Sequence, residues 1–531
     1  MPNYECDVCI IGSGISAAML AEKLAEKRPG LAITVVEAGN ALFDVANRIT
    51  YRQRSITYGE APWPNDVLDD QIGEGLICAT MAVGGQALLW GAACNRFSEE
   101  DLRLTSMYGL SVDWPLSYAE LEKAYCEAER RLNVAGEPSP YPEDRRSEPY
   151  PSPPVPLTYN LEVLKAWAEK SGLKFTPLPV ARNIKPTPDG RGVCCAFSSC
   201  VPLCPHGARY SPDWTFRKLI KEKKIVLHDR TLVRKLVLDG ARPVVAAAQA
   251  VHHDRPTETV EYRARLFVLA AGYAWSPHLL LLSACSQFPN GLANSSGLVG
   301  SYMNGHKSLT AQASIDAQLY DGQNTHHSLV SRYYLRCPKD KPFVRHDTRV
   351  WEGSAGRSPR LRDPNGRLLL GDELMDDWRA RTRGGGVRLR AYYDTHPSRD
   401  SRLTLNPAKK NRYGDPMPRI EHRFDEATLA REERVQKHIL GVFEQLARAD
   451  NGKILGSNVG DYLDHPGGGC RMGTDPPSSV CDSYGRTHDH ENLFVVGAPT
   501  TPTAGCINGG LTFAALALRS GDRILETLGR A

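Results

Sequence analysis

Two side chains in the C-terminal part of the chain could act together on an alcohol. His465 precedes a Pro-Gly-Gly-Gly run, and Asn508 lies 43 residues later, directly before Gly509. Oxidation of an alcohol removes a proton from oxygen and a hydride from carbon. A histidine accepts such a proton near neutral pH, and an asparagine amide orients the hydroxyl. A histidine before Pro-Gly-Gly is also a common turn residue, so the pair alone leaves both interpretations open.

A second group that could do chemistry is a run of closely spaced cysteines, namely Cys194, Cys195, Cys200 and Cys204, the last followed by proline. Thiols this close are metal ligands, disulfides or coincidence. Zinc sites usually contain two C-x-x-C pairs, which this segment lacks. Iron–sulfur clusters are held by cysteine thiolates, often with proline after the last one. The spacing favours an iron–sulfur cluster over a zinc site and leaves disulfides and coincidence as open interpretations.

A glycine-rich turn near the N-terminus has the spacing of a dinucleotide site. In Gly12-x-Gly14-x-x-Ala17, the first glycine permits a tight turn and the second lets the backbone approach a pyrophosphate. Ala17 lets the following helix pack close to the sheet. Glu37 lies 23 residues after Gly14, where an acid would bind the adenosine ribose. The pattern predicts a dinucleotide and does not separate NAD from FAD.

The elements that must position these residues occur at both ends and in the middle of the chain. Apolar runs typical of buried strands occupy residues 6–11, 32–37, 265–271 and 492–496, and helical patterns occupy residues 18–27 and 509–525. We therefore predict one discontinuous nucleotide domain, interrupted by segments that build a substrate domain. Residues 338–386 are rich in Arg, Asp, Gly and Pro and predict an irregular insertion in that substrate domain.

Composition excludes several other classes of protein. The chain has 531 residues, of which 41% are hydrophobic and 24% charged, and its net charge is +4. That charge is too small, and too little clustered, to indicate nucleic-acid binding. The most apolar stretch, 266–282, contains glycine, proline and histidine, so we expect no membrane span. The N-terminus has no signal-peptide pattern, and export would then depend on a partner.

The motifs together resemble the glucose–methanol–choline (GMC) oxidoreductases. The segment from His465 to Gly473, the strand ending at Ala498, and the helix start at Asn508 match the family's C-terminal pattern, with Gly509 in place of the usual proline. Residues 83–91 resemble the family's second flavin signature, and residues 113–118 and 296–300 also fit. The resemblance implies that His465 and Asn508 are the catalytic pair. Leu89 occupies the position at which some relatives attach FAD through a histidine, so we expect noncovalent FAD.

The same resemblance implies an α/β fold, α+β overall, with a discontinuous Rossmann-like FAD-binding domain and a substrate domain with a mostly antiparallel sheet. We expect the FAD-binding domain at 1–110, 190–305 and 455–531, and the substrate domain with insertions at 111–189 and 306–454. The cofactor contacts expected from the motifs and the resemblance are Gly12, Gly14, Ala17, Glu37, Gly84, Gly85, Val233, Ala271, Gly272, Ala498, Asn508 and Gly509. His306, His396, His488 and His490 lack such support and are expected at the surface or in structural roles.

Some bacterial sugar dehydrogenases of this family carry a [3Fe-4S] cluster in a similar segment. Their ligands resemble Cys194, Cys200 and Cys204, which would leave Cys195 as an alternative ligand or a bridge to a partner subunit. Such relatives work with a small exported chaperone-like subunit and a cytochrome c acceptor. By this resemblance we expect a location in the bacterial periplasm through a co-exported partner, and otherwise in the cytoplasm.

Three functions follow as hypotheses. The first is the flavin subunit of a sugar dehydrogenase that oxidises a pyranose or glycoside hydroxyl, with C3 of a glucoside favoured and C1 of an aldose as the alternative. An iron–sulfur cluster would pass electrons one at a time to an external acceptor, and an oxidase does not need such a relay. The second is a self-contained GMC oxidase that produces peroxide. The third is a noncatalytic electron-transfer flavoprotein, against which the presence of both His465 and Asn508 argues.

Overall fold

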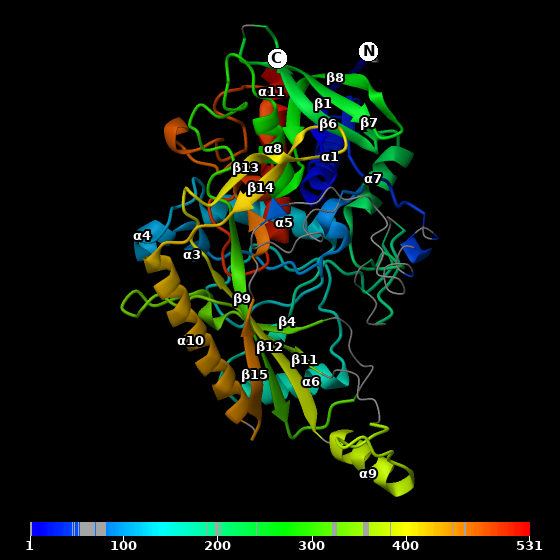
Figure 1. Cartoon of the computed structure of the whole chain (residues 1–531), viewed down its shortest axis with the longest axis vertical. Coiled ribbons are helices and arrows are strands. Elements are labelled where there is room, and N and C mark those ends of the chain that lie inside the picture. The colour runs from blue at the N-terminus through cyan, green and yellow to red at the C-terminus, as the bar shows by residue number, and fades with distance from the viewer. Residues whose placement is uncertain are drawn as a thin grey trace.

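The computed structural model describes most of the chain, and all of the predicted site residues lie in the described part. The described residues are 3–44, 46, 48–50, 53, 69–70, 81–187, 190–196, 200, 203–240, 242–320, 327–353, 360–382, 384–449, 451–460 and 463–530. Two large sheets, one above the other in Figure 1, organise these residues, and both termini lie at the upper end.

The upper sheet brings together strands from the beginning, middle and end of the chain. Its order is β5-β2-β1-β8-β7-β6, with β17 paired to β8. The strands are β1 (Asn3–Ile11), β2 (Ile33–Val36), β5 (Val226–His228), β6 (Thr231–Leu238), β7 (Val245–His252), β8 (Arg255–Leu269) and β17 (Leu493–Val495). The first βαβ unit, the middle strand and the last strand are thus parallel neighbours, which agrees with the discontinuous nucleotide fold.

Strand β1 is buried on both faces, which explains its uninterrupted apolar run. Val8 and Ile10 pack with helices α1 (Ile15–Lys27) and α11 (Gly510–Arg530), whereas Cys9 and Ile11 belong to a separate core on the opposite face. Strands of a parallel sheet covered on both sides have this composition. The tight packing of α1 on α11 explains the run of alanines in both helices.

The lower sheet is antiparallel and has the order β15-β9-β12-β11-β10-β4, with β16 also paired to β9. Its strands are β4 (Thr176–Pro177), β9 (Asn304–Ile315), β10 (Leu329–Ser331), β11 (Thr348–Glu352), β12 (Gly385–Asp394), β15 (Lys453–Val459) and β16 (Asp464–Gly467). Helices α6 (Tyr159–Glu169) and α10 (Glu426–Arg448) supply side chains to the core beside this sheet. The mixed α/β fold with a mostly antiparallel second sheet is confirmed.

The remaining strands and helices lie outside the two large sheets. Strands β13 (Arg402–Lys410), β14 (Pro416–Glu421) and β3 (Asp69–Asp70) form a small sheet. The other helices are α3 (Glu99–Leu102), α4 (Leu104–Tyr108), α5 (Tyr118–Leu132), α7 (Pro212–Lys221), α8 (Gly272–Leu282) and α9 (Gly371–Thr382), and the short 3₁₀ turns are η2 (Gly85–Leu88), η3 (Tyr333–Leu335), η4 (Pro476–Ser478) and η5 (Ala498–Thr500). The exact domain boundaries stay a prediction.

The expectation of an irregular insertion at 338–386 is wrong. Strand β11 lies inside this range and pairs with both β10 and β12. Its sequence, Thr-Arg-Val-Trp-Glu, contains two charged residues, yet Arg349 and Glu352 are buried. Charged residues normally argue against a buried strand. Here the Arg349 guanidinium donates to the amide oxygen of Asn508, so the polar composition of β11 reflects a buried hydrogen-bond network and not a loop.

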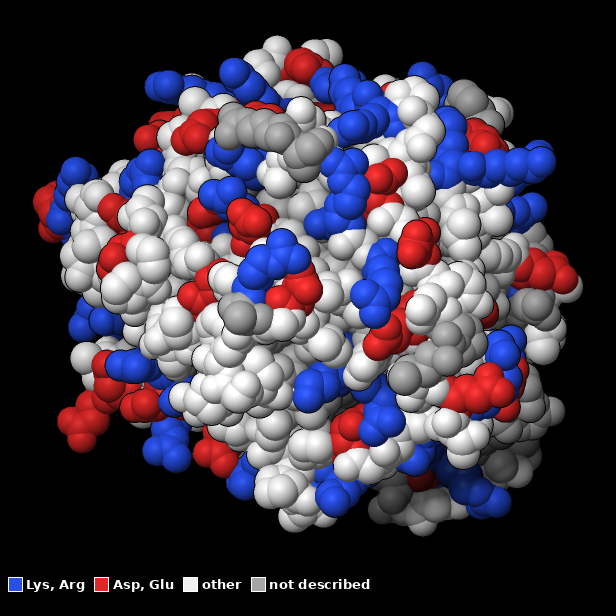
Figure 2. Space-filling model, turned by 90° about the horizontal axis from the view of Figure 1, so that it is seen from above, with Lys and Arg blue, Asp and Glu red and all other residues white. Residues whose placement is uncertain are grey.

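The surface carries charges of both signs. On the end of the molecule seen in Figure 2, Lys and Arg side chains alternate with Asp and Glu side chains, consistent with the small net charge of +4. Within the described residues, none of the helices combines the length and apolar character needed to cross a bilayer.

Candidate active site

A long cavity runs from the carboxyl ends of β1 and β2 to His465. The sequence-predicted residues that line it are Gly12, Gly14, Glu37, Gly85, Val233, Ala271, Gly272, Ala498 and His465. The cavity is therefore lined by segments that lie more than 400 residues apart in the sequence. The other predicted contacts, Ala17, Gly84, Asn508 and Gly509, are not among its lining residues. Ala17 is fully buried between helix and sheet, in the packing role that the motif assigns to it.

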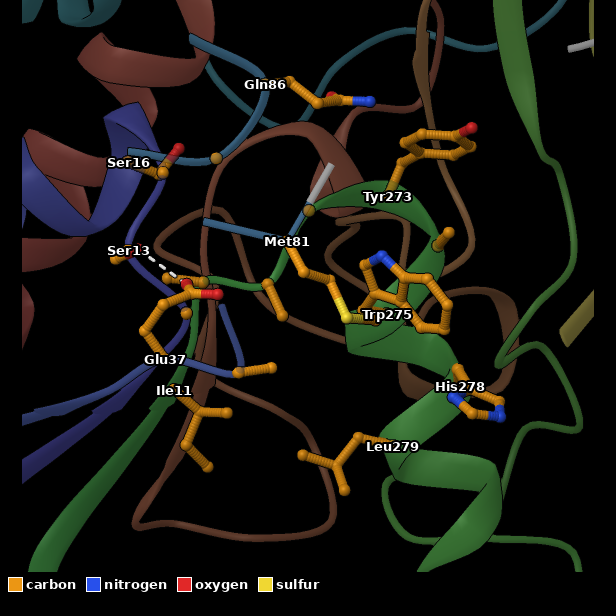
Figure 3. A pocket seen from close by; sticks show the side chains of 18 of the residues that line it. Ile11, Ser13, Ser16, Glu37, Met81, Gln86, Tyr273, Trp275, His278 and Leu279 are labelled. Carbon is orange, nitrogen blue, oxygen red and sulfur yellow. Dashed lines mark hydrogen bonds between the residues drawn. The ribbon is translucent and has the colours of Figure 1, made fainter. Parts of the chain in front are cut away.

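One end of the cavity is built around Glu37. The Ser13 hydroxyl donates to its carboxylate at 2.6 Å and the Gly39 amide donates at 2.8 Å (Figure 3). The Gly84 amide also donates to Ser13 Oγ at 3.2 Å, which ties the first glycine turn to the second flavin signature. Burial raises the pKa of Glu37 to about 7, against these hydrogen bonds. A buried carboxyl at this position suits the hydroxyls of a ribose.

The opposite wall is aromatic. Helix α8 presents Tyr273, Trp275 and His278 to the cavity across from Glu37 (Figure 3). Trp90 and Phe513 line it from other elements. Flat apolar walls of this kind suit a planar ring system. These residues were not predicted, because aromatic residues in isolation are indistinguishable in sequence from core residues.

The glycines of the first turn provide the test of whether a dinucleotide fits. A Cβ on Gly12 would lie 2.7 Å from the backbone oxygen of Ala270, so the protein itself requires glycine there. A Cβ on Gly14, in contrast, meets no atom within 4 Å and would enter the open cavity. The protein does not need glycine at this position for its own packing. A ligand that lies against the backbone at the start of α1 does require glycine at position 14, because a side chain there would occupy the ligand's space. A pyrophosphate bound at a helix N-terminus is such a ligand.

We expect the two glycines to respond differently to alanine. Gly14→Ala should leave the melting temperature of the flavin-stripped protein unchanged but weaken FAD binding about tenfold or more, equivalent to about 1.4 kcal/mol. Gly12→Ala should destabilise even the stripped protein, because its φ of +98° and the Ala270 contact impose strain of about 1–3 kcal/mol. Thermal melts with and without FAD, and flavin titration, measure both effects. Equal FAD affinity in Gly14→Ala and wild type would contradict the assignment.

The structure brings His465 and Asn508 into contact. Asn508 Nδ2 and His465 Nε2 are 2.8 Å apart, and the histidine ring is partly exposed to the cavity. The amide oxygen of Asn508 accepts a hydrogen bond from the Arg349 guanidinium and another, at 3.4 Å, from Asn95. The two predicted residues are therefore hydrogen-bonded to each other, and Arg349 and Asn95 hold the Asn508 amide in place.

A backbone irregularity sets the position of His465. Strand β16 pairs with β9 through Asp464 and Gly467, and the register shifts between them. Such a bulge redirects a side chain out of the regular alternation of a strand. His465 also has a φ of +49°, in the left-handed region that non-glycine residues seldom occupy. Strained residues of this kind persist where the surrounding structure holds them, often at functional sites.

His306 was expected to be a surface or structural residue, and the structure gives it a direct place in the site. It is fully buried on β9, and its Nε2 lies 2.9 Å from Nδ1 of His465. Burial lowers the pKa of His465 to about 3, and the charges of Arg349 and Arg390 lower it further. His465 is thus neutral over the physiological pH range. His306, Arg349 and Arg390 lie on strands more than 70 residues from His465 in sequence, so no local sequence signal could have identified them.

The cysteine segment lies behind the second flavin signature. Leu203 packs in one core with Leu88, and Arg209 donates to the Leu88 carbonyl at 2.6 Å. The Trp90 indole, which lines the cavity, donates to the Tyr210 carbonyl at 2.8 Å. The polypeptide that follows the cysteines is therefore bonded directly to the loop that lines the cavity.

The four cysteines of the segment differ in burial. Cys200 and Cys204 are buried, Cys194 is half-buried and Cys195 is exposed. Burial raises the pKa of the Cys200 thiol, the positive charges of Arg182 and Arg209 oppose that shift, and Cys204 and Cys194 are close enough to reinforce it. Cys194 and Cys204 therefore lie within electrostatic range of the Cys200 thiol, as do the buried Arg182 and Arg209. Thiolates and an anionic cluster would suit such a positive environment.

Comparison with known proteins identifies the family. Two GMC oxidoreductase family profiles match the chain, one over residues 30–307 and the other over residues 397–517. The chain belongs to the GMC oxidoreductases. It is accordingly an FAD-dependent oxidoreductase that acts on CH–OH groups, and the expectation drawn from the motifs is confirmed.

Individual GMC relatives match over almost the full length. The chain is 30% identical to the fructose dehydrogenase large subunit of Gluconobacter japonicus, over 99% of both chains. It is also 30% identical to 6'''-hydroxyparomomycin C oxidase of Streptomyces lividus, over 98% of this chain and 92% of the relative. Among solved structures, pyridoxine 4-oxidase from Mesorbium loti has a TM-score of 0.63 at 18% identity, covering 98% of this chain and 99% of that one. The last likeness concerns the fold alone.

Proposed function

We propose that this GMC oxidoreductase is the flavin subunit of a sugar dehydrogenase that passes electrons through an iron–sulfur cluster to an external acceptor. The observation that carries the proposal is the contact of Leu203, within the cysteine segment, with Leu88, together with the hydrogen bonds that join Arg209 and Tyr210, just after the segment, to Leu88 and Trp90. The similarity to a dehydrogenase large subunit supports it, since a large subunit has partners. The substrate is a pyranose or glycoside hydroxyl, with C3 of a glucoside favoured over C1 of an aldose.

His465 is the base in this proposal and Asn508 orients the substrate. FAD, when bound, supplies the hydride acceptor. In the free enzyme, His465 Nε2 faces the Asn508 amide. An alcohol hydroxyl can take the place of this contact, because it accepts from the Asn508 amide and donates its proton to the unprotonated nitrogen of His465. Arg349 holds the amide so that its NH₂ group points toward His465.

The cluster ligands in this proposal are Cys194, Cys200 and Cys204. The pattern of burial and electrostatic contact supports Cys194 over Cys195, because Cys194 is near enough to influence Cys200 and Cys195 is exposed. Cys195 is then available to a partner subunit. We include a small co-exported subunit and a cytochrome c acceptor as partners, and the bacterial periplasm as the location, on the resemblance to sugar dehydrogenases of this type.

A self-contained oxidase is the second candidate, since two of the similar proteins are named oxidases of aminoglycosides. The two candidates differ in measurable ways. The dehydrogenase predicts stoichiometric iron and acid-labile sulfide in anaerobically purified protein and slow reoxidation by oxygen. The oxidase predicts no iron and rapid peroxide formation. Identification of products by NMR, from a panel of sugars and glycosides with an artificial acceptor, determines which carbon is oxidised.

We expect kcat/KM for sugar oxidation to stay constant as the pH falls from 8 to about 5. The base is active when neutral, and protonation removes activity only as the pH approaches the lowered His465 pKa of about 3. An ordinary histidine would lose half its activity at about pH 6.5. The pH profile of anaerobic flavin reduction measures the effect, and Arg390→Met should move the acid limb upward by removing a positive charge near the ring. An acid limb near pH 6.5 in the wild type would contradict the lowered pKa of His465.

A further inference from the structure

His306 occupies a position that controls which ring nitrogen of His465 carries the proton. A guanidinium group is always a hydrogen-bond donor, so it fixes the direction of the hydrogen bonds that follow from it. The Arg349 guanidinium donates to one terminal atom of the Asn508 amide, which must therefore be the oxygen. Asn95 donates to the same atom, and Asn95 is itself oriented by Arg332, which donates to its oxygen at 3.0 Å. The NH₂ group of Asn508 is thus directed at His465.

The direction of the next hydrogen bond follows. Because Asn508 donates, Nε2 of His465 must accept and carries no proton. A neutral imidazole has one N–H, so the proton of His465 resides on Nδ1 and is donated to Nε2 of His306 at 2.9 Å. The proton of His306 then resides on Nδ1, where the Gly505 carbonyl accepts it at 3.2 Å. Every donor and acceptor along this line is matched.

The direction of this chain of hydrogen bonds is fixed at its last group, the Gly505 carbonyl, as well as at its first, the Arg349 guanidinium. A backbone carbonyl can only accept, just as a guanidinium can only donate, so the line has one possible direction. His306 is fully buried on β9 and packs against Tyr392 at a centroid distance of 4.4 Å with the ring planes tilted by 45°, which restricts the orientation of the imidazole. The charged groups that face it are Asp464 on β16 and Arg349 on β11, with His465 beside them.

We propose that His306, on β9 of the lower sheet, is a positioning residue. It holds His465 in the tautomer with an unprotonated Nε2, which can then accept the proton of the substrate hydroxyl. A free histidine side chain in water prefers the proton on Nε2, so the tautomer protonated on Nδ1 needs an acceptor at Nδ1. The inference rests on the proposed role of His465 as the base. The proposal makes no demand on the identity of the sugar or on the electron acceptor.

The test uses flavin-loaded protein with ¹⁵N-labelled histidine rings. NMR should show His465 with its proton on Nδ1 in the wild type, its signals being assigned by their absence in His465→Ala. His306→Gln offers an oxygen to His465 and an NH₂ to Gly505, and should keep this tautomer. His306→Leu removes the acceptor and should shift His465 toward the Nε2–H form. Anaerobic flavin reduction should slow about 100-fold in His306→Leu, with little change in KM, and recover largely in His306→Gln.

His490→Leu is the matched control, because His490 is also buried and also bonds to a backbone carbonyl, that of Pro243, at 2.9 Å. It should lower stability and leave the rate near that of the wild type. A proton on Nε2 of His465 in the wild type would overturn the proposal without any variant. Slow reduction in His306→Leu with an unchanged tautomer, or a changed tautomer with an unchanged rate, would also overturn it. Failure of His465 as the base is recognised separately, by full activity of His465→Ala.

Discussion

His465→Ala lowers the rate of flavin reduction by the sugar about 10²–10⁴-fold, the usual contribution of a positioned general base, while FAD stays bound. Flavin retention is expected because the pocket around Glu37 and Gly14 lies at the other end of the cavity. Alanine retains the Cβ, so the strain at a φ of +49° is similar in both proteins. Stopped-flow reduction without oxygen measures the chemical step separately from electron transfer to the acceptor.

Two comparisons make this result specific. His488→Ala removes a half-buried histidine whose Nε2 lies 2.8 Å from Ser479 Oγ, and should leave the rate unchanged. Added imidazole should restore part of the rate of His465→Ala, since the cavity reaches the vacated position. A rate for His465→Ala within a few fold of the wild type, with flavin bound, would remove the proposed base.

The second large effect is expected from Cys200→Ser. Serine is a poor ligand for iron–sulfur iron, so the variant should lose iron and acid-labile sulfide together with the paramagnetic resonance of an oxidised three-iron cluster. Turnover with a cytochrome-type acceptor should fall about 100-fold or more, because electrons leave the flavin singly. Reduction of the flavin by the sugar should continue at the wild-type rate, because Cys200 does not line the cavity.

Cys195→Ser is the matched control for the cluster. Cys195 is adjacent in sequence to Cys194 but exposed, and its replacement should leave the iron content unchanged. If Cys195→Ser loses the cluster and Cys194→Ser keeps it, the ligand assignment is reversed. If the wild-type protein contains no iron after anaerobic purification, the relay is absent, and rapid reoxidation by oxygen would then favour the oxidase.

The parts of the fold that the sequence predicted are those governed by local rules. The βαβ unit at the N-terminus followed from glycine spacing and apolar runs, and the observed α1 begins only three residues before the predicted helix. Residues 338–386 were misjudged because Arg349 of β11 is buried between Asp347, two residues before it, and the amide of Asn508, 159 residues after it. Composition describes an average over a segment, whereas burial of an arginine depends on the particular acceptor it meets.

Residue types at a fixed spacing were enough to predict the cofactor class, which the family confirms, and to suggest the pair His465 and Asn508 and an electron path through the cysteines. Only the tertiary structure revealed that His306 and Arg349 hold this pair from the second sheet, and that Cys194 and Cys195 occupy different environments. Hydrogen-bond direction and burial arise from contacts between segments far apart in the chain. A motif specifies which groups are present, and the packing of the two sheets decides where their protons reside.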